Sequence, residues 1–586
     1  MPRHFGIVAA AAGAALALTF APLAVAPPAL AQQDIYFDMD RIHPVHAAHG
    51  MVASQEALAT GVGVDILKAG GNAVDAAVAV GFALAVTLPS AGNLGGGGFM
   101  LVHMAKGGAA SGETAAIDYR EKAPAAATRD MFLDAAGEAD PQLSLFSPLG
   151  IGVPGTVAGL SLALERFGTI GLADALAPAI RLAEEGFAVT AELSQSLQAS
   201  RVRLEEFPST MAVFFHPDGA AYAPGEILKQ PDLAASLRLI AAAGPAAFYR
   251  GEIATQIAAE MQRSGGLITE ADLAAYEAKL RRPVGGTYRG YDVLSMPPPS
   301  SGGTHIVQIL NILEGYDIAA SGAGSARTVH LMAEAMKHAY ADRSEFLGDS
   351  DFVDVPVKGL TSKDYAARLR EEIDPDRATP SATIAPADPL PYEGDQTTHF
   401  SVVDAEGNAV SNTYTLNFSY GVGLVAEGTG ILLNNEMDDF SSKPGVANAY
   451  GLIGGDANAV EPGKRPLSSM SPTIVLKDGE VFLVTGSPGG SRIITTTLAV
   501  IMNVIDHGMN VAEASIAPRV HHQWLPDELR VEEGFSPDTL RLLEGMGHMV
   551  AVKASMGSTQ SILRREDGAL FGASDTRRPT ALTAGY

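Results

Sequence analysis

Gln396-Thr397-Thr398-His399-Phe400-Ser401-Val402-Val403-Asp404 is the stretch from which the organisation of this 586-residue chain is best read. It follows residues 380–394, a segment rich in Pro, Asp and Ala that predicts a loop. Residues 400–403 and 409–414 are rich in β-branched and aromatic side chains and predict the two strands of a hairpin, with a Gly-Asn turn at 407–408. Thr397 therefore stands where a loop enters a strand.

This position gives Thr397 a possible chemical role. A threonine hydroxyl is a weak nucleophile, and a free α-amine on the same residue is one way to activate it. Thr397 can have that amine only if the chain is cut between Gln396 and Thr397. The hypothesis is self-cleavage at this bond. The alternative is a threonine without a special role at the start of a strand, where threonine is common.

The composition is that of a globular protein, with 47% hydrophobic and 18% charged residues. The formal net charge of −26 argues against a nucleic acid or an anionic membrane as a partner, because both require a basic surface. The chain has no cysteine, which excludes disulfides, thiolate catalysis and cysteine-based metal sites.

Residues 1–31 have the pattern of a secretory signal peptide. Arg3 precedes an apolar run, residues 6–23, and Ala29-Leu30-Ala31 is a small-x-small cleavage site. The alternative is an N-terminal membrane anchor. We expect a mature protein that is periplasmic or secreted and has no membrane attachment. The later apolar run 76–88 is shorter than the roughly 20 residues that span a bilayer, and it predicts a buried helix.

A second hairpin is predicted from residues 473–476 and 481–485, which are joined at Asp478-Gly479, the strongest short hairpin signal. Gly486-Ser487-Pro488-Gly489-Gly490-Ser491 follows and opens a predicted helix, residues 492–506. Backbone amides at a helix start, with no side chain in the way, suit an oxyanion hole. The alternative is a glycine turn between a strand and a helix.

Three features lie nearer the N-terminus. Residues 93–98 contain four consecutive glycines, which predict a close approach of the backbone and, without a following Gly-Lys-Ser/Thr, no phosphate loop. Arg120 ends a predicted strand, residues 115–119, and is either an ordinary ion-paired residue or a bidentate clamp for a carboxylate. Residues 52–68 predict a helix with Ser54 as its N-cap.

Four motifs together resemble those of the bacterial γ-glutamyltransferases, which are N-terminal-nucleophile hydrolases. They are Gln396-Thr-Thr-His-Phe-Ser-Val-Val403, Asn434-Asn-Glu-Met-Asp-Asp-Phe440, Lys464-Arg-Pro-Leu-Ser-Ser-Met470 and Gly486-Ser-Pro-Gly-Gly-Ser-Arg492. The resemblance covers essentially the whole chain after residue 31. It implies an α/β fold, a four-layer αββα sandwich, built by two intertwined subunits of one precursor. These are a large subunit, residues 32–396, and a small catalytic subunit, residues 397–586.

The resemblance implies a mechanism as well. Thr397 attacks the carbonyl of Gln396 and cuts the chain. The freed Thr397 then attacks the γ-amide carbonyl of a γ-glutamyl compound such as glutathione, with its own amine as the base. A γ-glutamyl ester forms, and water, an amino acid or a peptide resolves it. Thr415 is implied to hydrogen-bond near the nucleophile, and the backbone of Gly489 and Gly490 to hold the oxyanion.

A γ-glutamyl group carries an α-carboxylate and an α-ammonium group, so its pocket needs partners of both charge signs. The resemblance assigns both sets: Arg120, Ser468 and Ser469 for the carboxylate, and Asn417, Glu436 and Asp439 for the ammonium group. Glu436 stands where some members have Gln, so its charge is expected to affect acceptor preference or the pH optimum. Taken singly, each of these residues reads as an ordinary loop or turn residue.

Residues 440–450 resemble the lid loop of the longer bacterial members, with Tyr450 as the gate over the bound glutamyl group. Its presence favours small γ-glutamyl substrates, because some relatives without it favour poly-γ-glutamate or cephalosporin side chains. His399 is implied to be part of the maturation site. No metal or organic cofactor is implied, and no two histidines have the H-x-x-x-H spacing of a zinc site.

Two other functions remain open. One is a cephalosporin (glutaryl) acylase-like amidase on the same fold, which needs no ammonium site. The other is an exported, uncleaved binding protein that keeps the fold without catalysis. In the favoured interpretation the partners are γ-glutamyl donors such as glutathione, acceptors that are amino acids, peptides or water, and the two subunits of the precursor as a heterodimer.

Overall fold

The computed structural model describes residues 42–105, 112–384, 397–448 and 451–586. The predicted signal peptide, Gln396 and Tyr450 lie outside the described residues. In the part of the chain that is described, no helix combines the length and the apolar character needed to cross a bilayer.

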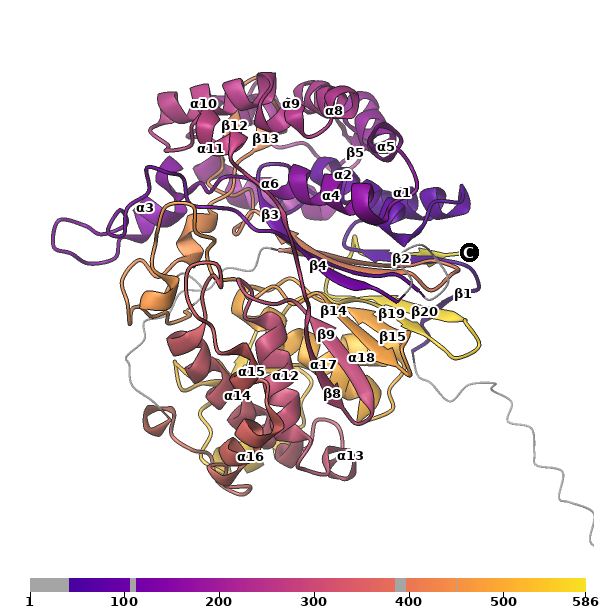
Figure 1. The fold of residues 1–586 in the computed structure, drawn as a ribbon, viewed down its shortest axis with the longest axis vertical. Helices are drawn as coiled ribbons and strands as arrows, with labels where there is room; N and C mark the ends of the chain where they lie inside the picture. Colours follow the sequence, from indigo (N-terminus) through magenta and orange to yellow (C-terminus); the bar gives the residue numbers. More distant parts are fainter. Residues whose placement is uncertain (1–41, 106–111, 385–396, 449–450) are drawn as a thin grey trace, which may run out of the picture. The chain divides into compact units, whose positions relative to one another are not determined.

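Two seven-stranded sheets, antiparallel throughout, form the centre of the fold (Figure 1). The first has the order β21 (Leu582–Gly585), β2 (Met51–Ser54), β10 (Thr398–Val403), β11 (Ala409–Thr415), β3 (Gly97–His103), β4 (Thr114–Tyr119) and β7 (Lys279–Arg281). The second has the order β1 (Val45–Ala47), β20 (Leu570–Ser574), β19 (Gln560–Arg564), β15 (Glu480–Thr485), β14 (Thr473–Lys477), β9 (Tyr291–Ser295) and β8 (Val284–Tyr288).

Helices cover the outer face of each sheet. On the first sheet lie α1 (Ala57–Lys68), α2 (Ala73–Thr87) and α4 (Thr156–Phe167), with α5 (Leu172–Glu185) and α8 (Pro231–Ala243) stacked outside them. On the second lie α12 (Gly302–Leu313), α17 (Ile493–Ile505) and α18 (Val511–Ile516), with α14 (Ala326–Phe346) and α16 (Lys363–Glu371) outside. The predicted αββα sandwich is confirmed.

Smaller elements complete the described chain. The remaining helices are α3 (Pro141–Leu145), α6 (Ala191–Leu204), α7 (Pro208–Phe214), α9 (Ala246–Tyr249), α10 (Glu252–Ser264), α11 (Glu270–Ala274), α13 (Ile318–Ser321), α15 (Val357–Leu360) and α19 (Pro537–Gly545). The remaining strands are β5 (Phe187–Ala188), β6 (Ile227–Leu228), β12 (Val425–Ala426), β13 (Ile431–Leu432), β16 (Val520–His521), β17 (Leu529–Glu532) and β18 (Val550–Lys553).

Strand β10 is buried on both faces, because its side chains alternate between two hydrophobic cores. Phe400 and Val402 belong to the core under the helices, whereas Val403 belongs to the core between the sheets. Ser401 also faces the second sheet, because its hydroxyl donates to the carbonyl of Gln560 at 2.9 Å. Side chains of a strand alternate between faces, so Thr397 and His399 belong to the inter-sheet face as well.

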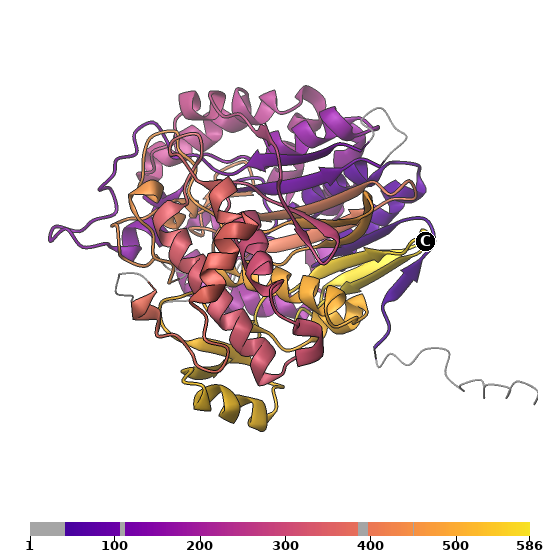
Figure 2. The same cartoon turned by 60° about the horizontal axis from the view of Figure 1, so that its bottom comes forward.

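The first sheet interleaves distant segments of the chain. The orange hairpin β10–β11 lies between the indigo β2 and the purple β3 (Figures 1 and 2). Strands from both sides of residue 396 therefore share one hydrogen-bonded sheet. If the chain is cut before Thr397, the two pieces remain joined by this sheet.

Both predicted hairpins are present, and Asp478 and Gly479 have the positive φ angles, 54° and 81°, of a two-residue turn. The predicted helix 52–68 is wrong at its start. Met51–Ser54 is strand β2, and α1 begins only at Ala57, with Glu56 as its N-cap. Pairing of β2 with β10 overrides the helical pattern, because it provides hydrogen-bond partners for the backbone of β2 and buries both faces of that strand.

Candidate active site

Thr397 lies at the inter-sheet end of the first hairpin. Thr398 pairs with Tyr414 across the hairpin, so the next residues along each strand, Thr397 and Thr415, come together. The Thr397 hydroxyl lies 3.5 Å from that of Thr415. The Thr415 hydroxyl accepts a hydrogen bond of 2.8 Å from the amide of Asn417. The predicted position of Thr415 beside the nucleophile is therefore present.

The four glycines of residues 95–98 press against this end of β11. A Cβ on Gly96 would lie 2.1 Å from the carbonyl oxygen of Thr415, and one on Gly98 would lie 2.4 Å from the Tyr414 Cβ. Asn93 also donates to the Thr415 carbonyl, at 2.8 Å. The run is thus a close backbone approach, as predicted, and it holds the strand end that carries Thr415.

Arg120 follows β4 and is fully buried in the site. Its guanidinium donates to the carboxylates of Glu436 and Asp439 and to the carbonyl of Pro466, the last at 3.2 Å. Glu436 and Asp439 are the two ends of a single 3₁₀ turn, so both carboxylates face the guanidinium. Arg120 is therefore buried and ion-paired within the protein, and its role as a clamp for a substrate carboxylate stays a prediction.

A third carboxyl group, that of Glu121, adds to this cluster. It lies 3.7 Å from the Arg120 guanidinium, and its oxygens have no hydrogen-bond partner among the described residues. Burial raises its pKa to about 7, although Arg120 acts in the opposite direction. Burial also raises the pKa of Glu436 and of Asp439. Three buried carboxyls beside one guanidinium are not all stabilised in the charged form, and a substrate ammonium group would favour their ionisation.

Ser468 and Ser469 line the same cavity, beside a cation that the sequence did not reveal. Arg343, on α14, donates to the hydroxyl of Ser469 at 3.4 Å and to that of Ser301 at 3.1 Å. Burial lowers the pKa of Arg343 to about 10, which Asp439 partly opposes. No sequence signal singles out Arg343, because it is one arginine on a long helix, 42 residues from Ser301 and 126 residues from Ser469. The site thus has two buried guanidinium groups.

Asn417 has a backbone conformation that few residues other than glycine adopt. Its φ angle is 73°, in the left-handed region that Asn tolerates better than most side chains. The Asn417 amide group donates to the carbonyl of Asn435 at 3.0 Å. This bond ties the end of the hairpin to the turn that carries Glu436 and Asp439.

The glycine loop after β15 approaches Thr397 from the second sheet. Gly489 and Gly490 have positive φ angles of 134° and 55°, which strain any other residue. Gly490 lines the cavity with Thr397, whereas Gly489 does not. No described residue accepts a hydrogen bond from either backbone amide. The loop therefore has the donors that an oxyanion hole requires.

His399 lies beneath this loop, and among the described residues no hydrogen bond joins its ring to the Thr397 hydroxyl. The Ser401 hydroxyl gives its only hydrogen to Gln560, so it accepts from His399 Nε2 at 3.1 Å, and the Thr413 hydroxyl contacts Nδ1 at 2.8 Å. Burial lowers the pKa of His399 to about 3, so the ring is neutral. Its predicted role in maturation stays a prediction, and its evident contact is with the backbone of Gly486.

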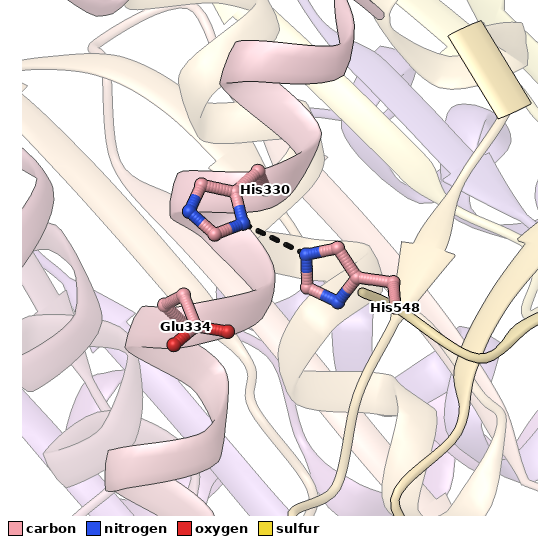
Figure 3. Close-up of side chains that lie close together, drawn as sticks. All are labelled: His330, Glu334 and His548. Carbon is pink, nitrogen blue, oxygen red and sulfur yellow. Dashed lines mark hydrogen bonds between the residues drawn. The ribbon is translucent and has the colours of Figure 1, made fainter. Parts of the chain in front are cut away.

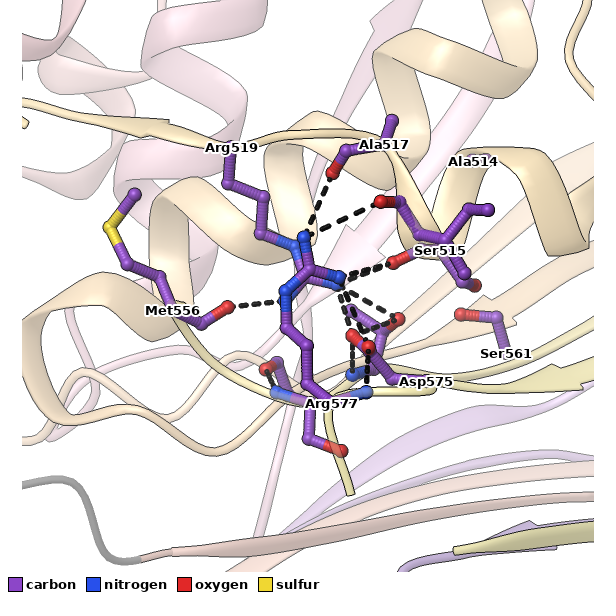
Figure 4. Close-up of polar contacts among 12 residues, drawn as sticks. Ala514, Ser515, Ala517, Arg519, Met556, Ser561, Asp575 and Arg577 are labelled. Atoms are coloured by element: carbon purple, nitrogen blue, oxygen red, sulfur yellow. Dashed lines mark hydrogen bonds and ion pairs between the residues drawn. The ribbon is translucent and has the colours of Figure 1, made fainter. Parts of the chain in front are cut away.

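A buried ion-pair network supports the glycine loop from behind (Figure 4). Arg519 pairs with Asp575 and donates to the carbonyl of Met556. The segment that starts at Met556 contacts the loop, because the amide of Ser558 donates to the hydroxyl of Ser487 at 3.0 Å. The network therefore fixes the surface against which this glycine loop packs.

The cavity gathers most of the predicted residues and is small, about 20 Å³. The predicted residues that line it are Thr397, Thr415, Gly490, Arg120, Asn417, Glu436, Asp439, Ser468 and Ser469. Gln396 and Tyr450, predicted as the cleavage residue and the gate, lie outside the described residues. Phe440, the first residue of the predicted lid, packs in a hydrophobic cluster with Met437, and Asn448 donates to the Asp439 carboxylate at 3.4 Å.

The family model described as Gamma-glutamyltranspeptidase matches residues 59–585. The chain belongs to the γ-glutamyltranspeptidase family. It is 58% identical to the glutathione hydrolase proenzyme of Escherichia coli (strain K12), over 100% of this chain and 99% of that protein. The predicted family is therefore confirmed.

Solved structures of this family and its neighbours have the same fold. Cephalosporin acylase from Bacillus halodurans superposes with a TM-score of 0.81 at 31% identity, over 94% of this chain and 98% of that one. The γ-glutamyltranspeptidase of Helicobacter pylori superposes with a TM-score of 0.56 at 46% identity, over 60% of this chain and 97% of that one. The acylase is the less similar of these two in sequence.

Proposed function

We propose that the chain is the precursor of a glutathione hydrolase that also transfers γ-glutamyl groups to amino acids and peptides. The proposal rests on one observation: Thr397 lines the same cavity as the cationic Arg120 and the acidic Glu436 and Asp439. Family membership and the similarity to glutathione hydrolase proenzymes support it.

Maturation begins at the Gln396–Thr397 bond. The Thr397 hydroxyl adds to the Gln396 carbonyl, the C–N bond breaks, and an ester with a free Thr397 amine results. Water then hydrolyses the ester and releases the carboxylate of Gln396. The products are the large subunit, residues 32–396 after removal of the signal peptide, and the small subunit, residues 397–586. The shared first sheet holds them together as a heterodimer.

Catalysis uses the groups that cleavage creates. The Thr397 amine takes the hydroxyl proton as the oxygen attacks the γ-carbonyl of glutathione, and it passes that proton to the leaving amine. The amides of Gly489 and Gly490 stabilise the tetrahedral oxyanion, and removal of one such donor costs about 10²–10³ in kcat in other enzymes. Water or the amine of an acceptor then attacks the γ-glutamyl ester and regenerates Thr397.

The charged residues orient the glutamyl group. Arg120, Ser468 and Ser469 bind the α-carboxylate, while Asn417, Glu436 and Asp439 surround the α-ammonium group. The Arg120 ion pairs with Glu436 and Asp439 exchange partners when substrate enters, because the zwitterion supplies one charge to each side.

Self-cleavage and catalysis are tested with one pair of variants. Thr397→Ala removes the nucleophile, so we expect one uncut chain without turnover of γ-glutamyl-p-nitroanilide. Thr398→Val is the matched control, because the neighbouring Thr398 hydroxyl is buried and has no hydrogen-bond partner among the described residues. The control should give two bands on a denaturing gel and a small chain whose first residue is Thr397. A cut or active Thr397→Ala protein would disprove the proposal.

The acylase alternative differs in the ammonium site. A glutaryl amide is a γ-glutamyl amide without the ammonium group, so it gains nothing from Glu436 or Asp439. We expect the wild-type enzyme to prefer the γ-glutamyl substrate, and Asp439→Asn to lose mainly that preference. If glutaryl amides are turned over equally well, the acylase function is favoured.

Export is part of the proposal. Residues 1–31 direct the chain to the periplasm or beyond and are then removed. Cell fractionation and N-terminal sequencing of the large subunit test this. A large subunit that begins at Met1 in the cytoplasm would contradict it.

A further inference from the structure

Three buried side chains that do not line the glutamyl cavity come together at α14. His330 and Glu334 lie four residues apart on one face of this helix, and His548 follows α19 (Figure 3). All three are buried, and their ligating atoms lie within 4.8 Å of one another. His330 Nδ1 is 2.8 Å from His548 Nε2.

The hydrogen bonds around His330 determine its tautomer. His330 Nε2 is 2.8 Å from the carbonyl of Asp374, which can only accept, so Nε2 carries the hydrogen. The lone pair of Nδ1 therefore points toward His548. A backbone carbonyl on the distal nitrogen is the usual second partner of a metal-bound imidazole.

We propose that His330, Glu334 and His548 form a binding site for one Zn²⁺ ion. Two imidazole nitrogens and one carboxylate oxygen are a common ligand set for zinc, with water as the fourth ligand. Zinc bond lengths of about 2.0–2.2 Å place tetrahedral ligand atoms about 3.3–3.5 Å apart. The two imidazoles must therefore separate by about 0.5 Å, and the proton on His548 Nε2 must move to Nδ1 of the same ring.

Lys337 opposes the metal. Its ammonium group donates to Glu334 Oε1 at 2.8 Å and to the carbonyl of Thr379 at 2.7 Å. The amide of Thr379 donates to Glu334 Oε2 at 3.1 Å, which orients the carboxylate. The ion and Lys337 compete for the same negative charge, so Lys337 lowers the affinity for zinc without blocking either imidazole.

The site would join the two proposed subunits. His330 and Glu334 precede residue 396, whereas His548 follows it, so the metal ties the subunits together if the proposed cleavage occurs. The same helix carries Arg343, which is about 13 Å along the axis from Glu334 at 1.5 Å per residue. Sequence spacing could not reveal the site, because the third ligand is supplied 218 residues away from His330.

The test uses the matured heterodimer, stripped with a chelator and titrated with Zn²⁺ by calorimetry. We expect about one Zn²⁺ per heterodimer, a loss of at least 100-fold in affinity in His548→Gln, and no change in His338→Gln. His338 is the matched control, since it is a buried histidine on the same helix outside the cluster. Lys337→Met should bind Zn²⁺ more tightly than the wild type.

Two results would overturn the proposal. One is wild-type protein that binds no more Zn²⁺ than His548→Gln does, which would leave the histidine pair as a structural hydrogen bond. The other is stoichiometric binding that His548→Gln does not weaken. If His548→Gln does not fold, Co²⁺ added to the wild type decides, because a tetrahedral site gives strong visible absorption and an absent band refutes it. Turnover of γ-glutamyl-p-nitroanilide by the stripped protein tests the proposed function separately.

Discussion

Gly486→Ala tests whether the backbone under the oxyanion loop sets the rate. A Cβ at this position would lie 2.4 Å from His399 Cε1, 2.6 Å from Nδ1 and 2.8 Å from Nε2. The ring cannot retreat, because Thr413 holds Nδ1 at 2.8 Å and Ser401 holds Nε2 at 3.1 Å. Non-bonded carbon atoms rest about 3.5–4.0 Å apart, so the start of the loop must move by about 1 Å.

Such a shift displaces the amides of Gly489 and Gly490 from the oxyanion. A misplacement of about 1 Å costs about 10²-fold in rate in other enzymes, and overpacking costs about 1–3 kcal/mol of stability. We therefore expect kcat for γ-glutamyl-p-nitroanilide to fall about 100-fold. KM should change much less, since Arg120 and Asp439 are not on this loop. If self-cleavage uses the same backbone amides, the rate of cleavage at the Gln396–Thr397 bond should also fall in this variant.

A control variant and a second substitution that removes the clash make this prediction specific. Gly545→Ala, at the end of α19, adds a methyl group that meets no atom within 4 Å, and should leave kcat unchanged. His399→Ala combined with Gly486→Ala removes the clash, so the double variant should be less damaged than the sum of the single effects, by about 0.5–3 kcal/mol. A Gly486→Ala enzyme within about threefold of wild type, or strictly additive effects, would refute the reasoning.

Three further predictions concern the substrate clamp, the loop support and the response to acid. Arg120→Lys loses the forked contacts of the guanidinium, so KM for glutathione should rise about 10- to 100-fold, and an unchanged KM would remove Arg120 from the carboxylate site. Arg519→Met frees the Met556 segment behind the oxyanion loop, so kcat should fall with little change in KM; the reverse pattern would show that the network acts on substrate binding. Burial lowers the pKa of both His399 and His521 to about 3, so the unfolded state binds more protons than the folded state below its pKa of about 6.5. Each histidine therefore costs about 2 kcal/mol of stability as pH falls from 6.5 to 5, whereas the raised pKa of Glu121 acts in the opposite direction. The contribution of His521 is the difference in urea midpoint between Thr397→Ala and the same protein with His521→Gln. That difference should change between pH 7 and pH 5, and an equal difference at both would contradict this.

Local patterns in the sequence were sufficient for several elements. The two hairpins follow from alternation and turn residues, and α2 follows from its continuous apolar run, in which every residue is buried. These signals are local because a turn or a strand pair is encoded within about ten residues. The position of Thr397 at the start of β10 belongs to this class.

Other features depend on contacts between distant segments. The helical pattern of residues 52–68 is wrong for the first residues of the predicted helix, which form strand β2. That strand pairs with β10, more than three hundred residues away in the sequence. Thr413, which contacts His399 Nδ1, likewise comes from the neighbouring strand β11. The Ser401 hydroxyl, which accepts from Nε2, is oriented by Gln560 on β19, and no pattern around His399 indicates these contacts.

The sequence by itself identified the family, and it predicted the nucleophile and the charged residues of the site from the motifs that contain them. Only the tertiary structure decided that Arg120 is buried among three carboxyls, that Arg343 joins Ser469, and that His548 faces His330. The physical reason is that a side chain's charge environment is set by neighbours that sheet pairing and helix packing bring together. Those neighbours leave no periodic signal along the chain.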